Sequence, residues 1–307
     1  MKKDLISVKD LTKGEILGLF RTAKALKSKP LSKKSHLKYK SLALVFQKPS
    51  NRTRVSFEVG MAQLGGQAIY LGPNEVRIGE RESVKDAAMV LSRYVDGIIT
   101  RTFGHEDAVT MAEFSSVPVI NGLSNLSHPC QGLSDLFTIN EYFGNRRVKI
   151  SFVGDGNNVL HSLLLGCSIL GRDICAATPE KCQPNADILK EARRIAAANK
   201  SRIELTDEPE KCVKSADVIY TDVWVSMGCE SERADRLNAF KGFQVNRELV
   251  SHAKKGVLIM HCLPAHRGEE ITDDILDSKN SIVYEQAENR LHVQKAILLK
   301  LLGTGKH

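Results

Sequence analysis

The sequence predicts an α/β protein of two domains, each a parallel sheet flanked by helices. Its 307 residues exceed one typical domain and fit two of about 150 residues. Short β-rich runs alternate with longer helical patterns, as is typical of βαβ units. A turn-rich break at Gly144–Arg147 separates the halves. We therefore expect domains at 1–145 and 146–285, with a C-terminal helix at about 286–307 packed back on the first, and the active site in the cleft between them.

The expected strands are apolar runs bounded by turn residues. They lie near Leu42–Phe46, Gln67–Leu71, Gly97–Thr100, Val117–Ile120, Val148–Val153, Asp173–Ala177, Ile203–Thr206, Val218–Tyr220 and Val257–Met260. The expected helices have apolar residues at three- and four-residue spacing, at Arg52–Leu64, Ser83–Tyr94, Asp187–Ala198 and Ala287–Leu302.

Composition excludes several classes of protein. The apolar fraction is 42%, the charged fraction 26%, and no apolar run approaches the roughly 20 residues that span a bilayer. The N-terminus lacks the apolar stretch of a secretory signal, and the seven cysteines include no Cys-x-x-Cys pair. We expect a cytoplasmic protein with reduced thiols. The net charge of +8 is dispersed, which suits a small anionic substrate at least as well as nucleic acid.

The segment Ser50-Asn51-Arg52-Thr53-Arg54 follows an apolar strand and opens a helix. A helix N-terminus presents unpaired N–H groups and partial positive charge, and arginine can give a phosphate two parallel hydrogen bonds. The segment predicts a phosphate site, although a solvated helix cap would have the same composition.

Gly154-Asp155-Gly156 follows the first strand of the second half and invites comparison with a dinucleotide-binding turn. Val159 occupies the third glycine position, and no acid follows at the expected strand end, so we do not predict a dinucleotide. The segment is either a tight strand-to-helix turn or a source of amide ligands, Asn157 and Asn158, at a strand's carboxyl end.

Three further polar segments follow predicted strands or loops. They are His128-Pro-Cys-Gln131, Asp222-Val-Trp-Val-Ser226-Met227-Gly228 and His261-Cys262-Leu263-Pro264. His261, Cys262 and His266 together suggest zinc, but no second Cys/His cluster completes a four-ligand set, and we predict no metal. A packed surface loop remains an alternative for the 222–228 segment.

Together these motifs resemble the transcarbamylase family, over nearly the whole chain. Ser-x-Arg-Thr-Arg and His-Pro-x-Gln look like the carbamoyl phosphate signatures of the family, and Asp-x-x-x-Ser-Met-Gly and His-Cys-Leu-Pro look like those of its ornithine-specific members. Ala287-Glu-Asn-Arg290 also matches the family pattern. The resemblance implies transfer of a carbamoyl group from carbamoyl phosphate to the side-chain amine of L-ornithine, giving L-citrulline and phosphate, with no cofactor.

The resemblance assigns roles residue by residue. Catalytic roles fall on Arg101, His128, Cys262 and Arg290. Carbamoyl phosphate is bound by Ser50, Asn51, Arg52, Thr53, Arg101, His128, Gln131, Cys262, Leu263 and Arg290. Ornithine is bound by Asn158, Asp222, Ser226 and Met227. Asn51 stands where the family usually has threonine, so a hydroxyl is lost while an amide donor and the backbone N–H remain.

The resemblance also implies a homo-oligomer, a trimer or a trimer-based assembly, in which Arg77 or Arg81 reaches a neighbouring subunit's site. It implies arginine biosynthesis, although the same site could serve the reverse, catabolic reaction. Two alternatives stay open: a transcarbamylase for putrescine or an acylated ornithine, and a non-catalytic relative that binds anions or nucleic acid. We expect neither a nucleic-acid nor a membrane partner.

Overall fold

The computed structural model describes residues 4–28, 36–76, 78, 81–144, 146–225 and 230–303. By its internal contacts the chain divides into two compact units, unit 1 within Met1–Phe137 and Glu288–His307, and unit 2 at Thr138–Ala287. This division falls inside helix α6 (Pro129–Phe143), earlier than the turn-rich segment suggested. Unit 1 is therefore built from both ends of the chain.

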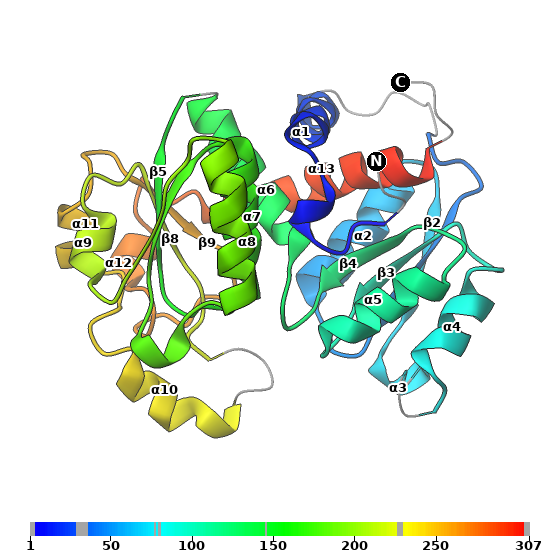
Figure 1. The fold of residues 1–307 in the computed structure, drawn as a ribbon. Coiled ribbons are helices and arrows are strands. Elements are labelled where there is room, and N and C mark those ends of the chain that lie inside the picture. The colour runs from blue at the N-terminus through cyan, green and yellow to red at the C-terminus, as the bar shows by residue number, and fades with distance from the viewer. Residues whose placement is uncertain are drawn as a thin grey trace. The chain divides into compact units, whose positions relative to one another are not determined.

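Unit 1 contains a four-stranded parallel sheet in the order β2-β1-β3-β4. Helices α4 and α5 lie on one face of it, and α2 and α13 on the other (Figure 1). The strands are β1 (Ser41–Phe46), β2 (Gln67–Leu71), β3 (Gly97–Arg101) and β4 (Val119–Leu123). The helices are η1 (Val8–Asp10), α1 (Lys13–Ser28), α2 (Asn51–Gln63), α3 (Pro73–Val76), α4 (Val84–Leu91), α5 (His105–Phe114) and α13 (Val283–Leu302), whose first residues belong to unit 2.

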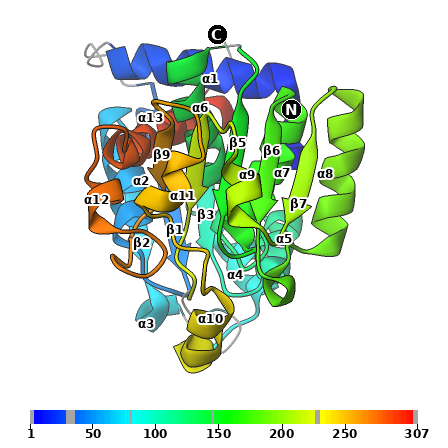
Figure 2. The same cartoon turned by 90° about the vertical axis from the view of Figure 1, so that its left-hand side faces the viewer.

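Unit 2 contains a five-stranded parallel sheet in the order β7-β6-β5-β8-β9. Helices α7 and α8 cover one face, and α9, α11 and α12 lie toward the other (Figures 1 and 2). The strands are β5 (Lys149–Val153), β6 (Asp173–Ala177), β7 (Ile203–Thr206), β8 (Val218–Thr221) and β9 (Leu258–His261). The helices are α7 (Asn158–Leu170), η2 (Glu180–Cys182), α8 (Ala186–Ala198), α9 (Pro209–Val213), η3 (Glu230–Glu232), α10 (Arg233–Ala239), α11 (Arg247–Ser251) and α12 (Asp273–Leu276).

The predicted α/β architecture is confirmed, because every expected strand forms and both sheets are parallel. The strands read as apolar runs since each sheet is covered on both faces, and β1 and β3 are buried almost throughout. The strand expected at 117–120 begins later, at Val119, because Pro118 has no N–H to give to a ladder.

Several helices differ from the sequence prediction, among them the first and the last. Helix α1 was not expected, although Ile16, Leu19, Phe20 and Ala23 are buried at helical spacing. Helix α13 begins at Val283 rather than Ala287, because β-branched and aromatic residues in its first turn hide a helix in sequence patterns. No helix in the described residues combines the length and the apolar character needed to cross a bilayer.

Both sheets have a point at which the strand order changes direction. In unit 1 it lies between β1 and β3, and in unit 2 between β5 and β8. Connections after these strands leave in opposite directions, which opens a crevice at their carboxyl ends where ligands bind in open α/β sheets. Ser50 and Arg101 belong to the first such point, and Asn158 and Asp222 to the second.

Candidate active site

The first turn of α2 forms as the phosphate hypothesis requires. Ser50 is the N-cap, in extended conformation, and its Oγ accepts a hydrogen bond of 3.3 Å from the Thr53 N–H. Asn51 and Arg52 are exposed at the start of the helix. The N-terminal turn therefore offers backbone donors, a positive dipole end and a guanidinium to an anion.

The second arginine of this segment, Arg54, is not directed at the N-terminus of α2. Arg54 donates to Glu58 at 3.0 Å, and its guanidinium stacks over the Tyr70 ring at 3.9 Å. It is held by its own helix and by β2. The cationic partners of the α2 terminus come instead from two distant segments.

Arg101 and Arg290 supply these charges, and both are buried. Arg101 is the last residue of β3, opposite Phe46 in the parallel ladder, and its Nε has no hydrogen-bond partner within the described part of the chain. Arg290 comes from α13 and donates through Nη2 to Thr53 Oγ1 at 2.8 Å. This hydrogen bond ties the end of the chain to the α2 terminus.

Burial, followed by the charges of Arg290 and Arg52, lowers the pKa of Arg101 to about 10. The guanidinium is still protonated at neutral pH, but its charge is held at a cost in free energy. A cluster of buried cations that disfavour one another is stabilised by an anion.

His128 is buried immediately before α6, and Gln131 lies in the first turn of that helix. The Gln131 side chain donates to Asp135 Oδ1 at 2.8 Å, which orients the amide. Burial, and then the charges of Arg290, Arg101 and Lys48, lower the pKa of His128 well below 6.5. Neutral imidazole can donate one hydrogen bond to a carbonyl without adding a charge.

Lys48 was missed by the sequence analysis. It is buried in the segment between β1 and Ser50, lies 5.0 Å from the Phe103 ring centroid, and acts electrostatically on His128. Its place directly after a buried strand was the signal that could have identified it.

We expect His128 to remain a neutral imidazole at pH 6 in the ligand-free protein. Because the native state cannot take the proton that an unfolded chain binds below about pH 6.5, acidification through this range should destabilise the fold by up to about 1.4 kcal/mol per pH unit. Ring ¹⁵N chemical shifts measure the protonation state directly, with the exposed His252 as a reference signal. Imidazolium shifts for His128 at pH 6 would refute the assignment.

In unit 2 the β5–α7 turn carries the amides suggested by the sequence. Asn157 caps α7, accepting from Val159 N and Leu160 N, and its Nδ2 donates to Asp222 Oδ2 at 2.7 Å. Asn158 is the first residue of the helix. A Cβ on Gly156 would lie within 2.5 Å of the backbone at residues 182–184, so only glycine permits this close approach.

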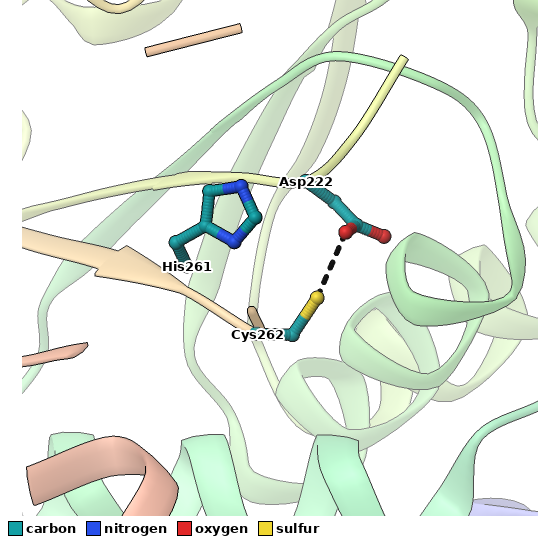
Figure 3. A group of neighbouring side chains, drawn as sticks. All are labelled: Asp222, His261 and Cys262. Carbon is teal, nitrogen blue, oxygen red and sulfur yellow. Dashed lines mark hydrogen bonds between the residues drawn. The ribbon is translucent and has the colours of Figure 1, made fainter. Parts of the chain in front are cut away.

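Asp222 lies directly after β8 and is buried. Its Oδ1 accepts from the Cys262 thiol and from the Val223 N–H, each at 2.8 Å. Figure 3 shows the thiol of Cys262 directed at this carboxylate, with the ring of His261 beside them. Neighbouring strands β8 and β9 thus bring the two residues together, as their adjacency in the sheet predicts.

The Asp222, His261 and Cys262 side chains are close enough for a metal ion. Both ring nitrogens of His261 are already engaged, however: Nε2 with Glu270 Oε1 and Nδ1 with the Leu263 N–H, each at 2.9 Å. His261 therefore orients the backbone of Leu263, whose φ of 57° lies in the left-handed region. The arrangement holds the Cys262–Leu263 segment in place.

Asp155 is a second buried acid near Asp222 that the sequence analysis did not select. Burial raises its pKa to about 6; the charge of Arg236 lowers it, and that of Asp222 raises it again. Arg236 Nη1 lies 3.0 Å from Asp155 Oδ2. The burial outweighs this ion pair because the carboxylate has lost most of its water.

Three predicted site residues lie outside the described part of the chain, and a fourth is exposed. Ser226, Met227 and Arg77 lie outside the described residues. Arg81 is exposed, before α4. The remaining predicted residues form two groups, one in each unit. Unit 1 holds Ser50, Asn51, Arg52, Thr53, Arg101, His128, Gln131 and Arg290, and unit 2 holds Asn158, Asp222, Cys262 and Leu263.

Family models match both halves of the chain. Residues 3–141 match the carbamoyl-P binding domain of aspartate/ornithine carbamoyltransferase, and residues 146–301 match its Asp/Orn binding domain. Curated relatives named ornithine carbamoyltransferase include one from Pyrococcus abyssi, 53% identical over 98% of this chain and 96% of its own length. One from Pyrococcus furiosus, named as anabolic, is 52% identical over the same shares.

Solved structures agree with these matches. An ornithine carbamoyltransferase from Pyrococcus furiosus superposes with a TM-score of 0.94 at 51% identity, covering 99% of this chain and 98% of that one. An anabolic ornithine carbamoyltransferase from Campylobacter jejuni gives 0.94 at 39% identity, covering 98% and 99%.

Proposed function

The chain belongs to the aspartate/ornithine carbamoyltransferase family, and we propose that it transfers the carbamoyl group of carbamoyl phosphate to the side-chain amine of L-ornithine. The products are L-citrulline and phosphate. The observation that carries this proposal is the concentration of Arg52, Arg101 and Arg290 around a neutral His128 at the N-terminus of α2. These charges suit a dianion with a carbonyl group next to it.

The amine attacks the carbonyl carbon, and a tetrahedral intermediate then releases phosphate. Arg101 and His128 donate to the developing oxyanion, and Gln131 holds the carbamoyl amide. Thr53 accepts from Arg290 and retains its own hydroxyl proton for the ligand. Arg52 and the α2 terminus stabilise the leaving phosphate. Preorganised donors of this kind usually contribute more to the rate of acyl transfer than any other single effect.

Unit 2 would bind the amino-acid substrate, ornithine. Asp222 accepts three hydrogen bonds, which orient its carboxylate toward the α-ammonium group, while Asn158 stands at the adjacent helix terminus. An alkyl ammonium of pKa about 10.4 costs roughly 4 to 5 kcal/mol to deprotonate at pH 7. Cys262 and Leu263 would receive the side-chain amine and favour its neutral form. Ser226 and Met227 are the other two residues proposed to bind ornithine.

A citrulline assay tests the proposal. We expect turnover with carbamoyl phosphate and ornithine that exceeds turnover with putrescine, acetylornithine or aspartate by at least about a hundredfold. Acetylornithine has no α-ammonium group to pair with Asp222, putrescine has no α-carboxylate, and aspartate has no side-chain amine to attack the carbonyl carbon. Preference for another acceptor, or salt-sensitive nucleic-acid binding without citrulline formation, would overturn it.

We further propose that the chain is a homotrimer, or an assembly of trimers, working in the cytoplasm toward arginine synthesis. The anabolic name of the Pyrococcus furiosus relative supports the direction. Arg77 or Arg81 would contribute to a neighbouring site. Light scattering of wild type and Arg81→Ala tests the assembly, and a monomer of full activity would contradict it.

A further inference from the structure

A turn that follows the Cys262–Leu263 segment brings together His266, Glu269 and Glu270, none of which is assigned to a substrate. The Glu269 N–H donates to His266 O, and the Gly268 N–H to Ile271 O, each at 2.9 Å. One ligand atom from each of the three side chains lies within 4.8 Å of the others. The backbone thus fixes three metal-ligating side chains on one turn.

Three buried polar atoms of this cluster have no hydrogen-bond partner among the residues that the structure describes. They are His266 Nδ1, Glu269 Oε2 and Glu270 Oε2. Glu270 is wholly buried. An unpaired carboxylate oxygen in the interior is costly, so a cluster of such atoms indicates a ligand that pairs them.

The other oxygen of each carboxylate is already engaged. Glu269 Oε1 accepts from Arg233, and Glu270 Oε1 accepts from the His266 N–H at 2.6 Å and pairs with His261 Nε2 at 2.9 Å. These contacts fix the two carboxylates. They leave one oxygen of each for an additional ligand.

The spacing of the cluster suits a shared ion better than a hydrogen bond. His266 Nδ1 and Glu269 Oε2 are 3.7 Å apart, which is too long for a hydrogen bond. Two ligands about 2.1 Å from one tetrahedral ion stand roughly 3.4 Å apart. A small adjustment would therefore bring both into one coordination sphere.

We propose that His266, Glu269 and Glu270 bind a divalent transition-metal ion of the Zn²⁺ type. One imidazole and two carboxylates favour zinc or a similar ion over magnesium or calcium, which prefer oxygen alone. Water would complete the coordination. The His266 side chain is 40% exposed although its Nδ1 is buried, so the cluster lies just beneath the protein surface. The prediction of no metal from the sequence counted only cysteine and histidine and overlooked the carboxylates.

The ion would have a structural role. Glu270 connects it to His261, and His261 Nδ1 accepts from the Leu263 N–H. A bound ion would fix Glu270 and through it the segment that carries Cys262. Since such carboxylate–histidine contacts orient their partners, metal should raise the melting temperature of the protein.

The test is Zn²⁺ titration of the metal-free full-length protein by calorimetry. We expect about one ion per chain, and binding at least tenfold weaker in His266→Ala and in Glu269→Gln, which keeps the side-chain shape. His252→Ala removes another exposed histidine, and Cys262→Ser removes the nearby thiol; both should bind as wild type does. Circular dichroism verifies that each variant is folded.

Cobalt provides a second measurement that does not depend on activity. Co²⁺ in a nitrogen-and-oxygen site gives visible bands without the intense near-ultraviolet thiolate band that a Cys262 site would show. Unchanged affinity in both His266→Ala and Glu269→Gln, loss of binding in Cys262→Ser, or no binding by wild type at about 100 μM Zn²⁺ would each overturn the proposal.

Discussion

Replacing Arg101 by methionine should reduce kcat/KM for carbamoyl phosphate by about a thousandfold or more, without destabilising the protein. In the proposed mechanism the guanidinium donates to the developing oxyanion, and loss of one such donor typically costs a factor of about 10² to 10³ before the loss of substrate binding is added. Methionine fills a similar volume in the buried position. Steady-state citrulline kinetics measure the first effect, and thermal unfolding the second.

The stability expectation follows first from the burial of the Arg101 charge and then from its repulsion by Arg290 and Arg52. The lowering of its pKa to about 10 corresponds to roughly 3 kcal/mol of unfavourable free energy in the folded state. Removing the charge should therefore leave the melting temperature equal or higher, and should raise the pKa of His128 because one of its cationic neighbours is gone. Activity and stability change in opposite directions, as expected where function requires strained electrostatics.

Arg194→Met is the matched control for this variant. Arg194 lies on α8, exposed and paired with Glu191, and its loss should change kcat/KM less than about twofold. If folded Arg101→Met retained a tenth of wild-type activity, the charge cluster would not be a site for a developing anion. If the variant unfolded, the expectation that the buried charge destabilises the protein would be wrong.

Replacing Asp222 by asparagine should mainly damage use of ornithine. Loss of the charge partner for an α-ammonium group costs about 3 kcal/mol in a buried setting, so kcat/KM for ornithine should fall by roughly a hundredfold or more. The dissociation constant of carbamoyl phosphate should change less than about threefold, because its proposed ligands belong to unit 1. Calorimetry and steady-state kinetics separate the two substrates.

A second readout for Asp222→Asn does not depend on catalysis. The charge of Asp222 contributes to the raised pKa of Asp155, which should therefore fall from about 6 in the variant. A raised folded-state pKa stabilises the protein below about pH 3.8, and this stabilisation is lost as pH rises toward 6. Because the pKa of Asp155 is less raised in Asp222→Asn, this variant should lose less stability as the pH rises from about 3.8 to 6. NMR titration of the Asp155 carboxyl measures the shift.

Two further variants distinguish charge from hydrogen bonding at this position. Cys262→Ser keeps a donor for Asp222 Oδ1 and should retain more ornithine activity than Cys262→Ala. Asp207→Asn, an exposed change, should behave as wild type. If Asp222→Asn weakened the use of ornithine and the binding of carbamoyl phosphate by the same factor, the assignment of Asp222 to ornithine would be contradicted.

The sequence predicted those parts of the fold and site that depend on neighbours along the chain. The strands were visible as apolar runs, and Ser50 as an N-cap directly after one of them, because strand, turn and helix are local patterns. Asp222 was selected for the same reason, as a polar residue at the end of a strand.

What the sequence could not show depends on distant contacts. The Arg290–Thr53 hydrogen bond joins residues 237 positions apart, and only the family resemblance singled out Arg290. The local pattern suggested that Arg54 and Arg52 would serve the same phosphate site. In the structure Arg54 contacts Tyr70 and Glu58 instead. The burial that lowers the pKa of His128 and raises that of Asp155 is a property of the packed units.

The return of α13 to unit 1 has a consequence for synthesis of the protein. Besides Arg290, this helix provides Asn289, which accepts from Lys27, Lys295, which donates to Gln63, and Lys300, which pairs with Glu15. During translation the N-terminal segment emerges first, but it lacks these partners until α13 has been synthesised. A nascent chain that ends before α13 therefore lacks Arg290 beside the α2 terminus, whereas a circular permutant that places α13 ahead of α1 would provide it early.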